Sequence, residues 1–175
     1  MASFFSHPAF PVALLISKAR PFISKKLFVL CCLLTLMPDA DVIAFRFGIP
    51  YASQWGHRGF THSIVFALFT GFICTFFSRK LDSTAKIVFV TTMLSTLSHS
   101  VFDALTNGGL GVAFFWPITS ERYFFPFRPV EVSPIGVKGF LSYRGLVVVF
   151  SEILWIWTPC LILSFLIRIM QKRHR

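Results

Sequence analysis

The sequence predicts an all-α, polytopic membrane protein with three long spans and two shorter N-terminal membrane helices. Of its 175 residues, 55% are hydrophobic and only 14% are charged, and the mean hydropathy is +0.71. The 23 phenylalanines exceed what a core of this size can bury, so the surplus must face lipid. A chain of this length forms one domain at most, and we expect residues 1–175 to be a single integral membrane domain.

Five apolar runs give the expected helices in order. The first two cover residues 4–16 and 27–37. At about 1.5 Å per residue they are too short to cross roughly 30 Å of hydrocarbon alone, so we expect short membrane helices or a re-entrant hairpin. The other three cover residues 60–77, 87–105 and 146–170. These approach or exceed the roughly 20 residues that a membrane span needs.

The segment 106–145 separates the last two runs and is rich in aromatic residues and prolines, as in residues 114–117 (Phe-Phe-Trp-Pro). Proline interrupts helices, and aromatic residues concentrate at the membrane–water interface. We therefore expect a loop that rests at headgroup depth. Two of its arginines, Arg122 and Arg128, could additionally hold a phosphate bidentately.

The formal net charge is +10, and the basic residues gather mainly in three clusters, within residues 18–26, 79–86 and 168–175. Cytoplasmic loops are enriched in Lys and Arg, so all three clusters are expected inside. This assignment places eleven basic residues inside and six outside. The charge therefore indicates topology and contact with anionic lipid headgroups, and we expect no nucleic-acid partner.

Three polar motifs lie at the edges of these runs: residues 38–41 (Pro-Asp-Ala-Asp), 56–63 (Gly-His-Arg-Gly-Phe-Thr-His-Ser) and 99–103 (His-Ser-Val-Phe-Asp). They contain three of the seven acidic residues and three of the five histidines. With the basic clusters inside, all three motifs fall at the same outer face of the membrane. His99 and Asp103 are four residues apart and share one helical face, as paired metal ligands on a helix do.

Small clusters of histidine and carboxylate are ligands of divalent metals, and such groups are costly at a membrane edge unless they are paired or bound. The motifs therefore predict a site for one or two divalent ions. Mixed histidine and carboxylate ligands suit Zn²⁺, Mn²⁺ or Fe²⁺, and the absence of a set of cysteine ligands means that zinc is not singled out. A single interfacial histidine needs no ligand role, but the set together favours metal binding. The predicted metal ligands are His7, Asp39, Asp41, His57, His62, His99 and Asp103.

Glu152 lies some six residues into the last apolar run. An acid at this depth needs a partner, and Glu152 could pair with an arginine such as Arg144 or complete the metal shell. We favour the pairing, or a place directly behind the metal ligands. His174 stands among basic residues of the tail. We expect it to contact solvent or headgroups and to have no part in the metal site.

The three motifs, with residues 115–117 (Phe-Trp-Pro), resemble the YdjM/YbcI-like family of small bacterial inner-membrane proteins, over about residues 7–160. The resemblance implies a multi-span helical protein of the bacterial inner membrane with a His/Asp metal site and metal-dependent hydrolase activity. His7 occupies the place of a histidine that members often carry near the N-terminus, and Pro8 follows it here. The motif residues that match by position are Asp39, Asp41, His57, His62, His99 and Asp103.

These observations predict a membrane-bound, metal-dependent hydrolase that acts on a lipid or lipid-linked ester or phosphoester at the outer face. A bound ion lowers the pKa of water towards about 7 and polarises the substrate, and a carboxylate serves as general base. The predicted catalytic residues are Asp39, Asp103 and Arg58. Arg58, Arg122 and Arg128 favour a phosphoester over a carboxylic ester.

Two alternatives remain open from the sequence. The same residues could serve a metal-binding transporter or sensor without hydrolytic turnover. They could also only hold helices together in a non-catalytic membrane interaction protein. Transporters place their ligands near the midplane on broken helices, whereas these motifs lie at span edges, which favours hydrolysis.

Overall fold

The computed structural model describes residues 1–17, 23–134 and 136–173. Within these ranges every regular element is helical, and only two isolated bridges, Thr106–Val130 and Val112–Tyr123, pair extended backbone. The predicted all-α class is therefore confirmed. The α-helices are α1 (Ala9–Ile16), α2 (Lys25–Leu34), α3 (Ile64–Thr75), α4 (Ala85–Ala104), α5 (Val137–Phe140), α6 (Tyr143–Glu152) and α7 (Thr158–Arg173). The 3₁₀ helices are η1 (Pro38–Phe47) and η2 (Phe60–His62), and η3 (Ile153–Trp157) is a π-helical turn between α6 and α7.

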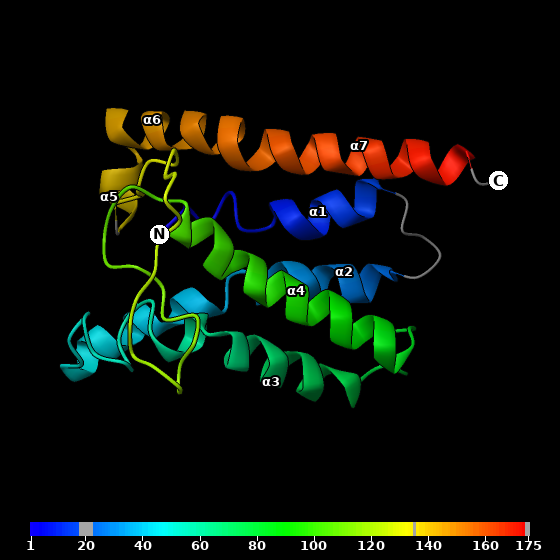
Figure 1. The fold of residues 1–175 in the computed structure, drawn as a ribbon, viewed down its shortest axis with the longest axis horizontal. Coiled ribbons are helices and arrows are strands. Elements are labelled where there is room, and N and C mark those ends of the chain that lie inside the picture. The colour runs from blue at the N-terminus through cyan, green and yellow to red at the C-terminus, as the bar shows by residue number, and fades with distance from the viewer. Residues whose placement is uncertain (18–22, 135, 174–175) are drawn as a thin grey trace.

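The helices lie side by side along the long axis of the molecule, with α6, η3 and α7 forming one continuous rod along its upper edge (Figure 1). Helix α1 packs on α7, and α4 packs between α2 and α3. One end holds η1, η2, α5 and the segments 106–134 and 136–142, while the turn between α3 and α4 lies at the other end (Figure 1). The three polar motifs therefore share one end of the helical bundle.

Side-chain caps set the starts of three helices. Ser24 Oγ accepts the Leu27 N–H at 3.0 Å, and Ser63 Oγ accepts the Phe66 N–H at 3.1 Å. Thr84 caps α4 in the same way. Each cap satisfies a backbone donor that the first helical turn leaves free. Because Ser63 begins α3, the preceding residues are released from the helix and fold into a turn.

The number of spans is lower than the sequence suggested. Among the described residues, two helices are long and apolar enough to cross a membrane, Ala85–Ala104 with 20 residues and Tyr143–Gln171 with 29 residues. The predicted long span over 60–77 is wrong, because η2 and the Ser63 cap leave α3 with only 12 residues. A third span exists only if α2 and η1 count as one, and they are bent by 41°.

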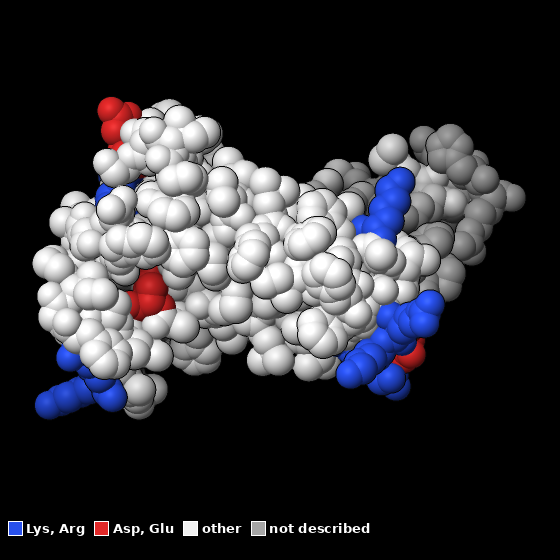
Figure 2. All heavy atoms as spheres, turned by 90° about the horizontal axis from the view of Figure 1, so that it is seen from below, with Lys and Arg blue, Asp and Glu red and all other residues white. Residues whose placement is uncertain are grey.

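The outer surface of the helical bundle is apolar, as a lipid-facing surface should be. Only 22% of the apolar window in Tyr143–Gln171 is buried by the protein, against 56% for α4, which makes α4 the central helix. Large side chains such as Phe69 and Phe165 are about 60% exposed. Charged side chains gather towards the two ends of the face seen in Figure 2, with a broad uncharged region between them. This pattern matches a hydrocarbon layer around the middle of the bundle.

Two of the predicted basic clusters meet at the end opposite the motifs. Lys26 lies 3.0 Å from Asp82, which joins the start of α2 to the turn between α3 and α4. Some positions of the first connection and of the C-terminal tail lie outside the described residues, namely Lys18, Arg20, His174 and Arg175. The described lysines alone are consistent with a cytoplasmic face at this end.

We expect this end to be cytoplasmic and the motif end to be outside. In a background without native cysteines, an Ile118→Cys variant should react with a membrane-impermeant thiol reagent added to intact cells, because Ile118 is 90% exposed. An Asp82→Cys variant should react only after the membrane is opened. Labelling of position 82 from outside would show that the orientation is inverted.

Candidate metal centre

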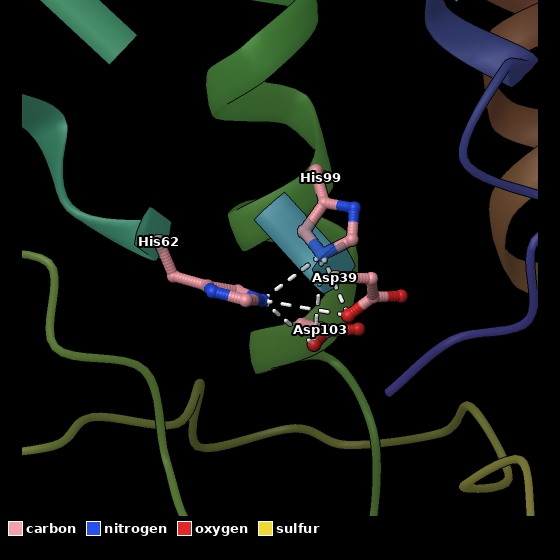
Figure 3. A group of neighbouring side chains, drawn as sticks. All are labelled: Asp39, His62, His99 and Asp103. Carbon is pink, nitrogen blue, oxygen red and sulfur yellow. Dashed lines mark hydrogen bonds and ion pairs between the residues drawn. The ribbon is translucent and has the colours of Figure 1, made fainter. Parts of the chain in front are cut away.

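Four side chains from three elements converge at the motif end of the bundle (Figure 3). Asp39 comes from η1, His62 from η2, and His99 and Asp103 from successive turns of α4. His99 Nε2 lies 3.0 Å from His62 Nε2 and 3.3 Å from Asp39 Oδ1. Asp103 Oδ2 lies 3.6 Å from His62 Nε2 and 4.0 Å from His99 Nε2. The i, i+4 pairing expected for His99 and Asp103 is therefore present.

These distances fit one metal ion. A tetrahedral ion with bonds of about 2.0–2.1 Å keeps its ligand atoms about 3.3 Å apart. The donor set is two imidazoles and two carboxylates, which all lie within 4.8 Å of one another. Asp39 Oδ1, which lies 3.3 Å from His99 Nε2 and 3.7 Å from His62 Nε2, is buried and has no hydrogen-bond partner. A cation coordinated here would satisfy it.

In both histidines, the partner of Nδ1 fixes the ring so that Nε2 points towards this centre. His99 Nδ1 lies 2.7 Å from the Thr35 carbonyl, which can only accept, so Nδ1 carries the proton. His62 Nδ1 lies 3.0 Å from Thr61 Oγ1, whose own hydrogen goes to Asp41 at 2.7 Å. With an ion bound between them, both rings would direct their Nε2 lone pairs to it. Partners on the outer nitrogen of a histidine are typical of metal sites.

The site carries excess negative charge. Three carboxylates, those of Asp39, Asp41 and Asp103, face a single buried guanidinium, that of Arg58. Burial lowers the pKa of His62, but the carboxylates of Asp103, Asp39 and Asp41 around its ring outweigh burial and raise that pKa to about 10. The cluster therefore favours a positive charge at its centre, which a divalent cation would supply.

The other predicted ligands surround these four. Burial and the neighbouring His99 lower the pKa of His7 to about 3, so its ring is neutral. That ring stacks on His99 with centroids 3.8 Å apart, and its Nε2 lies 3.7 Å from Asp39 Oδ2. His57 Nδ1 donates to Asp41 Oδ1 at 2.7 Å, and its buried Nε2 has no partner. Asp41 and His57 form a second group with His62, on the far side of the His62 ring.

The sequence model of the family described as YdjM inner membrane protein matches residues 1–175. The chain belongs to this family. It is also 36% identical over 166 residues to the inner membrane protein YbcI of Escherichia coli strain K12, a match that covers 93% of this chain and 95% of that protein. No solved structure matches. The family resemblance and the inner-membrane location expected from the sequence are confirmed.

In this YdjM-family protein, Asp41 joins two of the motifs. Its Oδ2 accepts hydrogen bonds from the Thr61 hydroxyl at 2.7 Å and from the Arg58 N–H at 3.2 Å. Its Oδ1 accepts from His57. All these donors belong to residues 56–63, so Asp41 anchors the turn that presents His62. Thr61 bonds Asp41, while Ser63 caps α3.

The arginines have protein partners for most of their donors. Arg58 is fully buried, with Nε on Asp103 at 3.0 Å, Nη1 on two backbone carbonyls and Nη2 on Thr106 Oγ1 at 2.9 Å. Arg122 donates through Nη1 and Nη2 to four carbonyls, including those of His57 and Ser53. Of the three arginines expected to favour a phosphoester, Arg128 alone makes no hydrogen bond or ion pair with the described residues, and its guanidinium lies over the Phe124 ring at 4.7 Å. The geometry thus gives Arg58 and Arg122 the role of fixing loops around the site.

The expected pairing of Glu152 with Arg144 is wrong. Arg144 forms its ion pair with Glu131 at 2.8 Å, whereas Glu152 accepts hydrogen bonds from Ser3 and Ser6. The sequence did not indicate two further contributions, that of Thr35 and that of the serines near the N-terminus.

Thr35 acts through its backbone carbonyl, which any residue possesses, so no side-chain pattern could have indicated it. The serines near the N-terminus carry no motif.

Proposed function

We propose that this protein is a membrane-bound, metal-dependent hydrolase that cleaves a lipid or lipid-linked ester or phosphoester at the outer face of the inner membrane. The observation that carries the proposal is the convergence of two imidazole Nε2 atoms and two carboxylates on one point at a membrane end. Mixed nitrogen and oxygen ligation suits Zn²⁺, Mn²⁺ or Fe²⁺. An ion held there supplies Lewis-acid polarisation of the substrate and lowers the pKa of water.

Asp39 is the residue best placed to act on a substrate. Its side chain is 15% exposed, while His62, His99 and Asp103 are fully buried. Both oxygens of Asp103 are held, Oδ1 by the Ala2 N–H at 2.6 Å and Oδ2 by Arg58. With Oδ1 on the ion, Asp39 Oδ2 would still be able to take a proton from an attacking water as general base. Arg58 holds Asp103 in place on the buried side of the centre.

The surroundings of Asp39 favour a lipid. A small acidic patch lies recessed among uncharged residues at this end of the molecule (Figure 2). On η1, which carries Asp39, Ile43 is 56% and Phe47 is 79% exposed. Apolar side chains beside a recessed polar centre would seat acyl or isoprenoid chains, with the ester near the ligands. Because Arg58 and Arg122 are engaged by the protein, the choice between phosphoester and carboxylic ester rests on Arg128 alone.

The test is turnover with lipid extracts. Purified protein loaded with Zn²⁺, Mn²⁺ or Fe²⁺ should release phosphate-bearing headgroups or fatty acid, and Asp39→Asn should reduce the rate by about 10²-fold or more, as expected for loss of a general base. Asp82→Asn is the matched control, because Asp82 is an exposed carboxylate at the opposite end. Stoichiometric metal without release from any lipid class would favour the transporter or sensor alternative.

A further inference from the structure

Glu152 is a fully buried carboxylate within the longest span, at the junction of α6 and η3. It accepts three hydrogen bonds, from the Ser3 N–H, from Ser3 Oγ at 2.6 Å and from Ser6 Oγ at 2.8 Å. All three donors belong to one short segment that precedes α1. An acid inside a span is costly unless its oxygens are satisfied, so this contact is specific and strong.

The same segment reaches the metal centre. The Ala2 N–H donates to Asp103 Oδ1 at 2.6 Å, which leaves Oδ2 turned towards the other ligands. At the other end of the segment, the His7 ring stacks on His99 and its Nε2 lies 3.3 Å from the Ala2 carbonyl. Ala2, Ser3, Ser6 and His7 are all at most 2% exposed. Residues 2–7 thus form a wall of the centre, and Glu152 lies behind this wall.

The helix geometry changes directly after Glu152. The five residues of η3 form a π-helical turn, and Thr158 Oγ1 bonds the Ile153 carbonyl five residues earlier at 2.8 Å. Such turns add one residue to the helical repeat and frequently occur at functional sites. Here the widened turn follows the residue that holds the segment 2–7.

We propose that Glu152 is a positioning residue that holds residues 2–7 against the metal centre, so that Ala2 orients Asp103 and His7 covers His99. The proposal rests on the metal centre of the proposed function. It couples the last span to the centre although none of the four converging ligands lies on that span. Loss of Glu152 should free the segment, and Asp103 and His7 should lose their fixed orientations.

The affinity for Zn²⁺ and the visible spectrum of bound Co²⁺, which reports coordination geometry, test this proposal without requiring turnover. Glu152→Ala should weaken Zn²⁺ binding about 10- to 100-fold and alter the Co²⁺ spectrum, as loss of an outer-shell partner does. Glu152→Gln keeps an acceptor oxygen and should fall between Glu152→Ala and the wild type. Glu131→Gln is the matched control, because Glu131 is a carboxylate of the same end that pairs with Arg144.

A paired variant, Ser3→Ala with Ser6→Ala, removes two of the three donors and leaves the carboxylate in place. It should reproduce most of the loss of affinity, and adding it to Glu152→Ala should cause little further loss, because the residues act as one unit. This variant also keeps the proposal testable if Glu152→Ala does not fold. Wild-type affinity and spectrum in folded Glu152→Ala and in the serine variant would overturn the proposal.

The outcomes also separate this proposal from the proposed hydrolysis. If the wild-type protein binds metal but releases nothing from lipids, and Glu152→Ala weakens binding, the hydrolase fails and the positioning role stands. Failure of the wild-type protein to bind Zn²⁺ or Co²⁺ would overturn both.

Discussion

Replacing His99 with alanine is expected to reduce the bound divalent metal from about one ion per chain to background. His99 Nε2 lies within 4.0 Å of a ligand atom from each of the other three members of the set. The ring is fully buried beneath His7 and tied to the Thr35 carbonyl, so water cannot easily take its place. His62→Ala should have the same effect. Elemental analysis of the purified protein measures it directly.

The effect should be graded with distance from the centre. Asp41→Asn keeps all four ligands but weakens the hold on His62, so we expect metal affinity to fall about 10- to 100-fold instead of being abolished. His174 is the one histidine that is not a predicted ligand, so His174→Ala should leave the metal content unchanged. Equal metal content in the His62→Ala, His99→Ala and wild-type proteins would contradict the site.

The meeting of the motifs could be predicted because it depends on few variables. Clusters of Lys and Arg orient each helix, and the direction of each apolar run then decides which end carries a motif. His99 and Asp103 needed only the helical repeat to share a face. The structure accordingly brings Asp39, His62, His99 and Asp103 together although they are spread over residues 39–103.

The lengths of the helices could not be predicted in the same way. The predicted span begins at residue 60, but residues 60–62 form η2, because Ser63 caps α3 and Asp41 binds the preceding turn. Hydropathy does not register such side-chain contacts from distant parts of the chain. The same limit applies to Glu152, whose partners lie 146 and 149 residues away. An acid in a span indicates that a partner exists, but the sequence does not say which one.

Arg58 illustrates how a residue type leaves its role open. An arginine beside histidines and acids indicates phosphate binding, but its guanidinium is buried and directed into the protein. Its φ of 63° lies in the left-handed region, which is unfavourable for any residue with a side chain. The contacts of the guanidinium explain why arginine stands at a position that glycine would occupy with less strain.

Replacing Arg58 with alanine is therefore expected to lower the free energy of unfolding by about 3–5 kcal/mol, because it leaves the buried Asp103 carboxylate without its guanidinium partner. Arg58→Lys should recover only part of this loss. A lysine presents one compact ammonium, whereas the guanidinium reaches Asp103, Thr106 and two carbonyls of the following loop at once. Unfolding of metal-free protein in detergent, monitored by circular dichroism during SDS titration, measures the change without a contribution from bound metal.

Two further variants separate charge from backbone strain. Arg58→Gly removes the same contacts as Arg58→Ala but relieves the positive φ, so it should be more stable than Arg58→Ala by about 1 kcal/mol and still far less stable than the wild type. Arg128→Ala should cost only about 0.5–1 kcal/mol, since the Arg128 guanidinium lies over the Phe124 ring without a buried ion pair. If Arg58→Gly were as stable as the wild-type protein, the guanidinium contacts would contribute nothing and Asp103 would need another source of compensation. Parallel losses in Arg58→Ala and Arg58→Gly, with Arg128→Ala nearly unchanged, would show that the ion pair with Asp103 holds the site end of the bundle together.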